Sequence, residues 1–435
     1  MPSFAVRNFG CRVNQAEAFA WADAFRERGL RLDEDWGRSD VVVVNSCTLT
    51  GRAERDVRKF IRAVHRENPT TRIIVTGCYA ERAAGEMAAL PGVVSVLPQS
   101  AKAGLADRMV AFEEQKGSSG QEGPSGRTIG TDLEDAVDVD RATSLRARAY
   151  LKVQDGCDGR CAYCIIPSVR GRSRSVPLGA VAASVSGLAG RGFREIVLAG
   201  IHLSSYGEDL EPRSSLLGLL GELREAAGPA RLRLSSLDPR KTDMALVARV
   251  AGDPGICPHV HLSLQHASGR VLRSMDRAVE PGSYEALLIE LRRLAPEAAI
   301  GADVMVGFPG ETEADFEELK GFVDRTALTY VHVFSYSSRP GTPAAARPPV
   351  QPGIVTERAK ALRHLSALKD YRFRRRFIGR VLDAVVIDRS EKGAEVLTGN
   401  FIKATVPLCQ APVREFVRVM IKRVLPRRTE GEIAS

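Results

Sequence analysis

The chain lacks a long apolar run. None of its 435 residues lies in a stretch approaching the ~18 consecutive apolar residues that a membrane-spanning helix needs. The first residues, Met1-Pro-Ser-Phe-Ala-Val-Arg-Asn8, also lack the apolar core of a signal peptide. We therefore expect a cytoplasmic protein with no membrane partner.

Disulfide bonds are not expected either, although the chain has eight cysteines. In a cytoplasmic protein, a cysteine set of this size indicates metal or redox chemistry. Hydrophobic residues make up 44% and charged residues 26% of the chain, which is typical of a soluble globular protein. The length predicts two or three domains.

Three of the cysteines lie close together in the stretch Cys157-Asp-Gly-Arg-Cys161-Ala-Tyr-Cys164. Three thiols cannot all pair as disulfides. A tetrahedral zinc site would lack a nearby fourth ligand, because no Cys or His lies between Cys164 and His202. Three soft thiolates with one open position suit an iron–sulfur cluster whose fourth iron binds a non-protein group. A zinc knuckle or three inert thiols is the alternative.

Three further cysteines are dispersed through the first hundred residues, where strands and helices alternate. Their pattern predicts strands at 4–9, 40–45 and 72–76, and helices at 14–28, at 51–66 and from 79 onward. This order predicts a small open parallel sheet. A cysteine follows each strand, and parallel strands end at one shared edge, so we expect a second metal centre on Cys11, Cys47 and Cys78. Buried structural thiols are the alternative.

The central part of the chain predicts a second α/β domain. Residues 112–146 are rich in Gly, Ser and charge and are interpreted as a surface linker. Beyond it, six strand candidates alternate with helices, at 148–153, 194–199, 231–236, 259–264, 298–306 and 328–335. Six parallel strands with helices outside predict an open, partial (β/α)6 barrel over 147–375. Its chemistry should lie at the carboxyl ends of the strands, and the Cys157 loop follows the first of them.

Polar residues and glycines gather at those same strand ends. The turn Gly307-Phe-Pro-Gly-Glu-Thr312 leads into a helix capped by Thr312 and Asp315, and such a helix start can approach an anionic ligand. Strand-end residues of this kind are candidates for a cofactor pocket. Four histidines in this region are expected to hydrogen-bond within the barrel rather than act as ligands or bases: His202, His259, His261 and His266.

The last segment is basic and all-β. Residues 372–435 hold 14 Lys and Arg against 7 Asp and Glu, in a chain whose net charge is +9. Short strands at 381–387, 394–397, 401–406 and 416–424 predict a small OB-like β-barrel over 376–435. The positive charge indicates a polyanionic partner, most simply RNA bound through its phosphates. A dimerisation or packing module is the alternative.

The order of these parts resembles the radical S-adenosylmethionine (SAM) methylthiotransferases, which end in a TRAM domain. Local motifs agree: Gly10-Cys-Arg-Val-Asn-Gln15, Val44-Asn-Ser-Cys-Thr48, Thr76-Gly-Cys-Tyr79, the Cys157 loop and the Gly307 turn. The resemblance implies an N-terminal methylthiotransferase domain at 1–111, a radical SAM core at 147–375 and a TRAM-like RNA-binding domain at 376–435. Family branches act on isopentenyladenosine in tRNA, on a ribosomal-protein aspartate, or on threonylcarbamoyladenosine in tRNA. Residues 199–207, 234–239 and 331–342 look most like the third branch.

The resemblance also implies two [4Fe-4S] clusters and SAM as cofactors. One cluster, on Cys157, Cys161 and Cys164, would bind SAM and reduce it to a 5′-deoxyadenosyl radical; the other, on Cys11, Cys47 and Cys78, would hold the sulfur. The expected product is the 2-methylthio derivative of N6-threonylcarbamoyladenosine at position 37 of tRNA. A flavodoxin- or ferredoxin-like electron donor and a sulfur source are required. A zinc-loaded RNA-binding protein without catalysis is the distant alternative. The candidate SAM-binding residues are Tyr163, Gly200, Ser235, Gln265 and Gly307.

Replacing Cys161 with Ala should abolish SAM cleavage, because two thiolates cannot hold a cluster that leaves one iron open to SAM. The measurement is 5′-deoxyadenosine formation by anaerobically reconstituted protein. A variant that still makes 5′-deoxyadenosine at the wild-type rate would refute the role assigned to the loop.

Overall fold

The structure is a computed structural model and describes residues 3–33, 35–114, 147–277, 279 and 282–434. The chain divides into two compact units. The first takes in the described residues up to 114 together with Ile166–Arg172, and the second takes in 147–165 and the chain from Ser173 onward. Helix α5 (Leu105–Glu114) runs past the start expected for the linker at 112, and the rest of that linker lies outside the described residues.

The first unit is built on a five-stranded parallel sheet in the order β2-β1-β3-β4-β5. The three predicted strands are confirmed as β1, β3 and β4. The edge strands β2 and β5 were not predicted, because two and four residues are too few to show a periodic pattern. The bounds are β1 (Ser3–Asn8), β2 (Arg31–Leu32), β3 (Val41–Ser46), β4 (Arg72–Gly77) and β5 (Val93–Val96).

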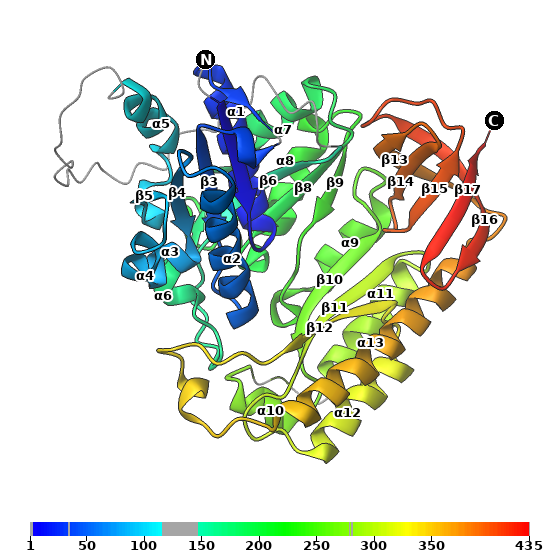
Figure 1. Ribbon diagram of the computed structural model, residues 1–435. Coiled ribbons are helices and arrows are strands. Elements are labelled where there is room, and N and C mark those ends of the chain that lie inside the picture. The colour runs from blue at the N-terminus through cyan, green and yellow to red at the C-terminus, as the bar shows by residue number, and fades with distance from the viewer. Residues whose placement is uncertain (1–2, 34, 115–146, 278, 280–281, 435) are drawn as a thin grey trace. The chain divides into compact units, whose positions relative to one another are not determined.

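Helices cover both faces of this sheet (Figure 1). The valine run of β3 explains why both faces must be covered, since alternate side chains point to opposite sides. Val41 and Val43 pack with helices α1 (Arg12–Glu27) and α5. Val42 and Val44 pack on the other face, with α2 (Gly51–Glu67), α3 (Cys78–Arg82) and α4 (Ala84–Ala88).

The second unit contains all six strands predicted for the central domain. Together with the short strand β7 they form two sheets, one in the order β7-β6-β8-β9 and one in the order β10-β11-β12. Isolated bridges, among them Leu237 with Leu262, lie between the two sheets. The short antiparallel strand β7 (Arg174–Ser175) was not predicted. The parallel strands are β6 (Ala149–Asp155), β8 (Glu195–Gly200), β9 (Arg231–Leu234), β10 (His259–Gln265), β11 (Ala299–Val306) and β12 (Tyr330–Ser335).

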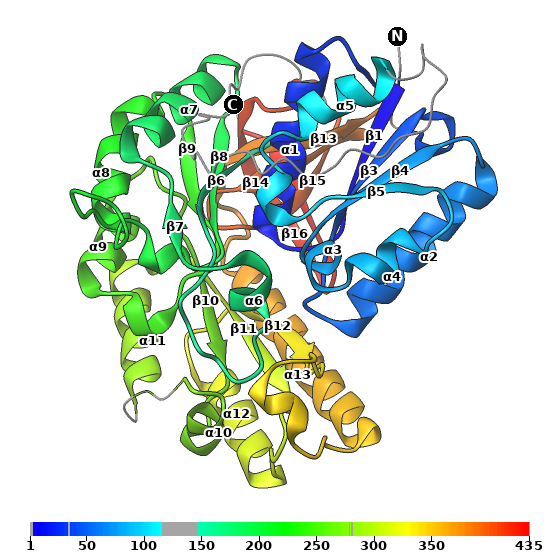
Figure 2. The same cartoon turned by 90° about the vertical axis from the view of Figure 1, so that its left-hand side faces the viewer.

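Helices alternate with these strands and lie along their outer side (Figure 2). They are α7 (Leu178–Gly190), α8 (Leu216–Ala226), α9 (Met244–Gly252), α10 (Gly269–Ser274), α11 (Ser283–Leu294), α12 (Glu313–Arg325) and α13 (Pro352–Arg375). The predicted cap of α12 is confirmed, because Thr312 and Asp315 form a reciprocal capping box. Among the helices of the described ranges, none combines the length and apolar composition that crossing a bilayer requires.

The C-terminal part of the second unit is a closed barrel of five strands, in the order β13-β14-β15-β17-β16. This confirms the small all-β barrel. The last strand was missed, because its sequence Arg-Thr-Glu-Gly-Glu-Ile has no apolar alternation. The strands are β13 (Val381–Ser390), β14 (Gly393–Thr398), β15 (Lys403–Pro407), β16 (Phe416–Leu425) and β17 (Arg428–Ile433).

A buried carboxylate joins this terminal barrel to the strands of the core. Glu195 on β8 is fully buried and is contacted by the guanidinium groups of Arg148, Arg231 and Arg233. Burial alone would raise the pKa of Glu195, but these three arginines hold it well below its usual value of 4.5. The remaining N–H groups of two arginines reach barrel carbonyls: Arg231 donates to Leu397, and Arg233 donates to Thr398 and Gly399.

Replacing Glu195 with Gln should destabilise the contact between the barrel and the core by about 3–5 kcal/mol, because it leaves buried guanidinium groups without their anion. Hydrogen exchange of peptides from 381–433 measures the loss as faster opening. Since the pKa of Glu195 is depressed in the folded state, its contribution is complete above the ordinary value of 4.5 and falls as acid protonates it. The difference from wild type should therefore shrink at low pH.

Glu222→Gln is the matched control, because Glu222 is exposed on helix α8. Equal exchange protection of the terminal barrel in wild type and Glu195→Gln would show that this carboxylate does not hold it.

Two candidate cysteine centres

The first unit places its three cysteines after neighbouring strands of one sheet. Cys11 caps the start of α1 after β1, Cys47 follows β3, and Cys78 opens α3 directly after β4. None forms a disulfide. Burial raises the pKa of the Cys47 thiol to about 12, and the nearby Cys11 and Cys78 add to the rise. The parallel order of β1, β3 and β4 thus gathers at one edge three thiols that are far apart in the sequence.

Two glycines allow the backbone to approach closely at this edge. Gly77, before Cys78, has φ +99°, and a Cβ there would lie 2.3 Å from the carbonyl oxygen of Ser46. Gly10, before Cys11, has φ +144°, and its Cβ would lie 3.2 Å from that of Cys47. Both positions therefore require glycine for steric and conformational reasons.

A buried arginine binds this group of residues from a distant part of the sequence. Arg170, at the end of α6 (Ile166–Arg170), belongs to the first unit, and its Nε donates to Cys78 Sγ at 3.2 Å. Its other nitrogens donate to Asn14 Oδ1 at 2.7 Å and to Glu17 Oε1 at 3.1 Å. No periodic pattern marks Arg170, so sequence reasoning missed it. The signal that was available is its position six residues after Cys164.

The charges around these thiols favour deprotonated sulfur once a metal is bound. Arg170 and Lys102 are both buried and both contact the carboxylate of Glu17. Two cations thus meet one carboxylate beside the cysteines. Burial raises the pKa of Cys11, while the positive charge of Arg170 opposes that rise. Thiolates bound to a metal would supply balancing negative charge, because metal binding removes the thiol proton.

The second unit carries the other three cysteines on the loop that follows β6. Cys157, Cys161 and Cys164 are partly exposed and form no disulfide. Burial would raise the pKa of Cys157, but hydrogen bonds from His202 and from the Gly159 N–H lower it overall. The neighbours of Cys157 therefore favour its ionised form.

A network of polar side chains contacts the cysteine loop. Asp238 is buried and accepts hydrogen bonds from His202 at 3.3 Å and from Arg277 at 3.2 Å. Burial would lower the pKa of His202, but its contacts with Asp238 and Cys157 raise it to about 9. Arg277 also lies 3.7 Å from Cys161 Sγ. The network thus connects Cys157 to Cys161 through His202, Asp238 and Arg277.

A buried glutamine joins the loop to the next strand. The Gln154 side chain donates to the Gly156 carbonyl at 2.9 Å and accepts from the His202 N–H at 2.8 Å. It therefore links the carboxyl ends of β6 and β8. Gln154 and Arg277 were not singled out from the sequence. Gln154 was detectable as a polar residue at a strand end, whereas nothing in the local sequence marks Arg277.

The five candidate cofactor residues occupy the ends of separate strands and the cysteine loop. Gly200 ends β8, and its N–H points to Ser235 Oγ at 3.4 Å, which places these two residues together. Tyr163 is half-buried and packs with an apolar cluster that includes Met305 and Phe308. Gln265 ends β10 with φ 69°, a strained conformation for a residue with a side chain.

The Gly307 turn is held by its own carboxylate. The N–H groups of Gly307 and Phe308 donate to Glu311, which also pairs with Arg358 at 2.8 Å. Gly307 has φ +75°, and a Cβ there would lie 2.5 Å from Val355. Because Glu311 already engages these N–H groups, a ligand at this turn would approach its exposed rim rather than those amides.

The donor chemistry of both cysteine groups fits an iron–sulfur cluster. Each group offers three thiols that form no disulfide. Soft sulfur donors of this kind are the ligand type that iron–sulfur clusters take.

Two family models match separate parts of the chain. Residues 3–98 match the uncharacterized protein family UPF0004, and residues 151–323 match the Radical SAM superfamily. A solved radical S-adenosylmethionine methyltransferase, TsrM from Kitasatospora setae, shares the fold with a TM-score of 0.55. It is 14% identical and covers 79% of this chain and 77% of its own.

Curated relatives match nearly the whole chain. The threonylcarbamoyladenosine tRNA methylthiotransferase of Aquifex aeolicus is 35% identical over 92% of this chain and 95% of its own length. The protein of the same name from Bacillus subtilis is 32% identical, over 99% and 96%. The ribosomal protein uS12 methylthiotransferase of Anaeromyxobacter sp. (strain Fw109-5) is 34% identical, over 91% and 83%. The chain therefore belongs to the radical SAM methylthiotransferase family.

Proposed function

We propose that this protein converts N6-threonylcarbamoyladenosine to its 2-methylthio derivative at position 37 of tRNA. The observation that carries the proposal is the pair of cysteine groups, each formed by three thiols that follow strand ends and form no disulfide. They occur in a chain that matches threonylcarbamoyladenosine tRNA methylthiotransferases over nearly their whole length.

We assign one cluster to each cysteine group. Cys157, Cys161 and Cys164 would hold one [4Fe-4S] cluster, and Cys11, Cys47 and Cys78 would hold the other. The two sheets of the second unit would act as one partial (β/α)6 wall. When bound, the clusters and SAM would supply the radical and the sulfur. A radical route is needed because adenine C2–H is neither acidic nor electrophilic enough for acid–base or substitution chemistry. The residues proposed to contact SAM are Tyr163, Gly200, Ser235, Gln265 and Gly307.

The side chains of the second unit position the cluster ligands. His202 lowers the pKa of Cys157 and is itself held by Asp238. Arg277 bridges Asp238 and Cys161 and so restrains the other end of the loop. These partners fix the orientation of cysteine ligands in the way that supporting hydrogen bonds fix metal ligands generally.

The terminal barrel supplies the contact with tRNA. Lys422, Arg423, Arg427 and Arg428 are exposed on or between β16 and β17, where they can reach phosphates. The barrel cannot be deleted cleanly, because Arg231 and Arg233 donate to its carbonyls. An electron donor and a sulfur source complete the set of partners that the reaction needs.

A ribosomal-protein aspartate is the second candidate substrate. The observation in its favour is the 34% identity to a ribosomal protein uS12 methylthiotransferase over 91% of this chain. A basic barrel suits a ribosomal target as well as tRNA. The experiment must therefore measure methylthiolation of both tRNA and the ribosomal protein.

The proposal is tested with a strain that lacks the gene, complemented with wild type or with Cys47→Ala. Wild type should restore 2-methylthio-N6-threonylcarbamoyladenosine in tRNA nucleosides, and Cys47→Ala should not. Mass analysis of uS12 from the same cells tests the second candidate. Methylthiolated uS12 with unchanged tRNA nucleosides would overturn the tRNA assignment.

Purified Cys47→Ala protein should retain the cluster on the Cys157 loop, because Cys47 lies in the other unit. We expect about half of the wild-type iron and continued formation of 5′-deoxyadenosine, with no sulfur inserted into tRNA. A purely structural Cys47 predicts near-normal iron and product, with about 1 kcal/mol of stability lost. Iron quantification and nucleoside analysis on one preparation decide between the two.

Replacing Arg170 with Lys should weaken retention of the N-terminal cluster, because Lys cannot contact Cys78, Asn14 and Glu17 together. We expect roughly half of the iron to be lost to a chelator about tenfold faster than in wild type. Arg172→Ala, at an exposed position two residues away, is the control. Identical kinetics of iron loss in both variants would contradict this role for Arg170.

A further inference from the structure

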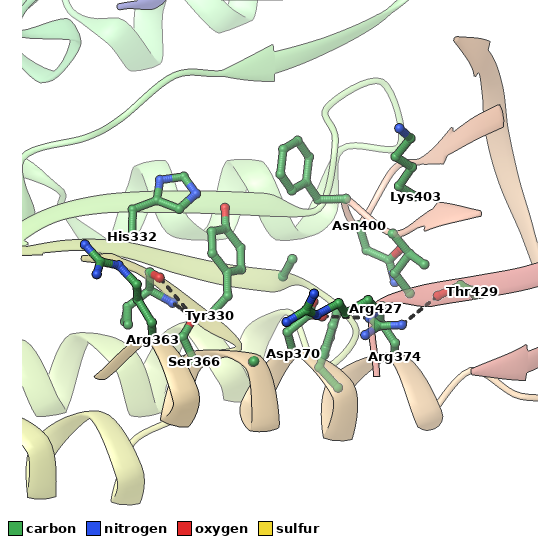
Figure 3. A pocket seen from close by; sticks show the side chains of 16 residues that line it. Tyr330, His332, Arg363, Ser366, Asp370, Arg374, Asn400, Lys403, Arg427 and Thr429 are labelled. Carbon is green, nitrogen blue, oxygen red and sulfur yellow. Dashed lines mark hydrogen bonds and ion pairs between the residues drawn. The ribbon is translucent and has the colours of Figure 1, made fainter. Parts of the chain in front are cut away.

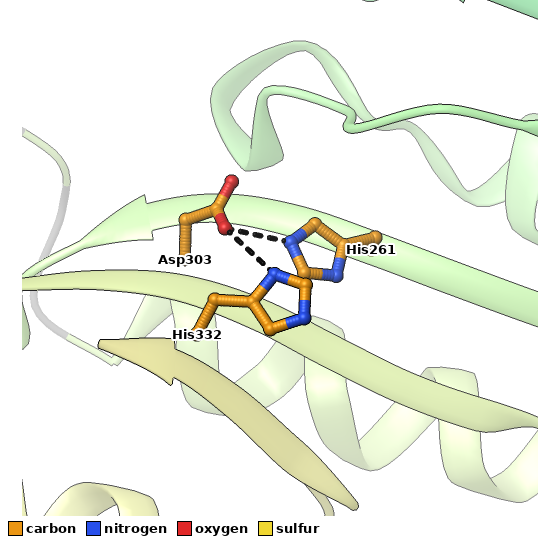
Figure 4. A group of neighbouring side chains, drawn as sticks. All are labelled: His261, Asp303 and His332. Carbon is orange, nitrogen blue, oxygen red and sulfur yellow. Dashed lines mark ion pairs between the residues drawn. The ribbon is translucent and has the colours of Figure 1, made fainter. Parts of the chain in front are cut away.

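A third group of metal-ligating side chains lies on β10, β11 and β12, outside both cysteine centres. His261, Asp303 and His332 come from these three neighbouring strands and point toward one another (Figure 4). Asp303 is in register with His332, and Gly301, two residues earlier on the same face, is in register with His261. The parallel ladder therefore places all three side chains on one face of the sheet.

Two of the distances within this group fall in the range found between ligands of one metal ion. His261 Nε2 lies 2.9 Å and His332 Nδ1 lies 3.4 Å from the same oxygen, Asp303 Oδ1. The three ligand atoms all lie within 4.8 Å of one another. Nitrogen and oxygen ligands about 2.0–2.2 Å from one ion are separated by roughly 2.8–3.6 Å.

A supporting hydrogen bond orients the buried histidine. Tyr330 Oη lies 3.1 Å from His261 Nδ1, which turns the Nε2 atom toward Asp303. Gly301 makes this possible, because a Cβ there would lie 2.2 Å from the Tyr330 ring and 2.6 Å from His261 Nδ1. Histidine ligands usually make such a hydrogen bond through the ring nitrogen that does not face the metal.

The group is open on one side. The side chain of His261 is 7% exposed, that of Asp303 18% and that of His332 53%. His332 also lines a cavity of about 420 Å³ between α13, β12 and the terminal barrel (Figure 3). Three protein ligands with an accessible side leave positions for water or another oxygen ligand, as in catalytic rather than structural metal sites.

We propose that His261, Asp303 and His332 bind a divalent first-row transition cation. Two imidazoles and one carboxylate form the ligand set that open Fe²⁺ sites and many Zn²⁺ sites use. The site is separate from both cysteine centres in residues and in ligand chemistry, and it does not depend on the proposed tRNA activity. The competing interpretation is an ion pair in which Asp303 only accepts hydrogen bonds from two histidines.

The test uses full-length protein with both clusters reconstituted anaerobically, so that the six cysteines are occupied. After removal of loosely bound metal, the protein is dialysed against Zn²⁺, and zinc and iron are quantified together. Wild type should bind about one zinc ion per chain in addition to the iron of its clusters. X-ray absorption at the zinc edge should show nitrogen and oxygen ligands only, at about 2.0–2.1 Å.

His332→Ala should weaken zinc binding at least about tenfold without changing the iron content, because His332 is exposed and its loss opens no cavity in the core. Asp303→Asn, which keeps the side-chain shape, should have the same effect. His364→Ala, an exposed histidine on α13, should bind zinc like wild type. Equal binding by wild type and both site variants, sulfur in the zinc shell, or no zinc retained by wild type would each overturn the proposal.

Discussion

The edge at which parallel strands end is the constraint on which both cysteine centres depend. Hydrogen bonding fixes β1, β3 and β4 side by side and in the same direction, so residues that follow them must meet. Cys11, Cys47 and Cys78 lie at one edge for that reason. In the second unit the same rule sets Gln154 at the end of β6 beside His202 after β8. The direction of the strands thus decides where these functional side chains lie, independently of their own contacts.

Buried charges then hold together segments that no sheet or helix connects. A buried ion is costly unless it is paired, so each charged group in these interiors is tied to a specific partner. Arg170 joins the stretch that follows the cysteine loop to the first unit through Glu17. Glu195 pairs with two arginines, Arg231 and Arg233, and so orients them to donate hydrogen bonds to the terminal barrel. The first unit therefore includes a short segment, Ile166–Arg172, that lies within the sequence of the second unit.

The metal chemistry of the chain separates by ligand type. The cysteine groups offer soft sulfur donors, which suit iron–sulfur clusters, whereas the group on β10 to β12 offers harder nitrogen and oxygen donors. Because the donor atoms of the two kinds of site differ and lie on different strands, the proposed metals can be tested separately. Aromatic packing of His259, Tyr330 and Phe401 connects the latter region to the terminal barrel.

The sequence by itself determined the two groups of three cysteines, the six strands of the core and the small basic barrel. Spacing and apolar periodicity are local properties and can be seen without the structure. The sequence did not determine β2, β5, β7 and β17, which are short or polar. The tertiary structure alone decided the partners of Arg170, Glu195 and Arg277 and the convergence of His261, Asp303 and His332. A charged or metal-ligating side chain carries no local sign of its partner, since that partner is supplied by a strand or loop distant in sequence.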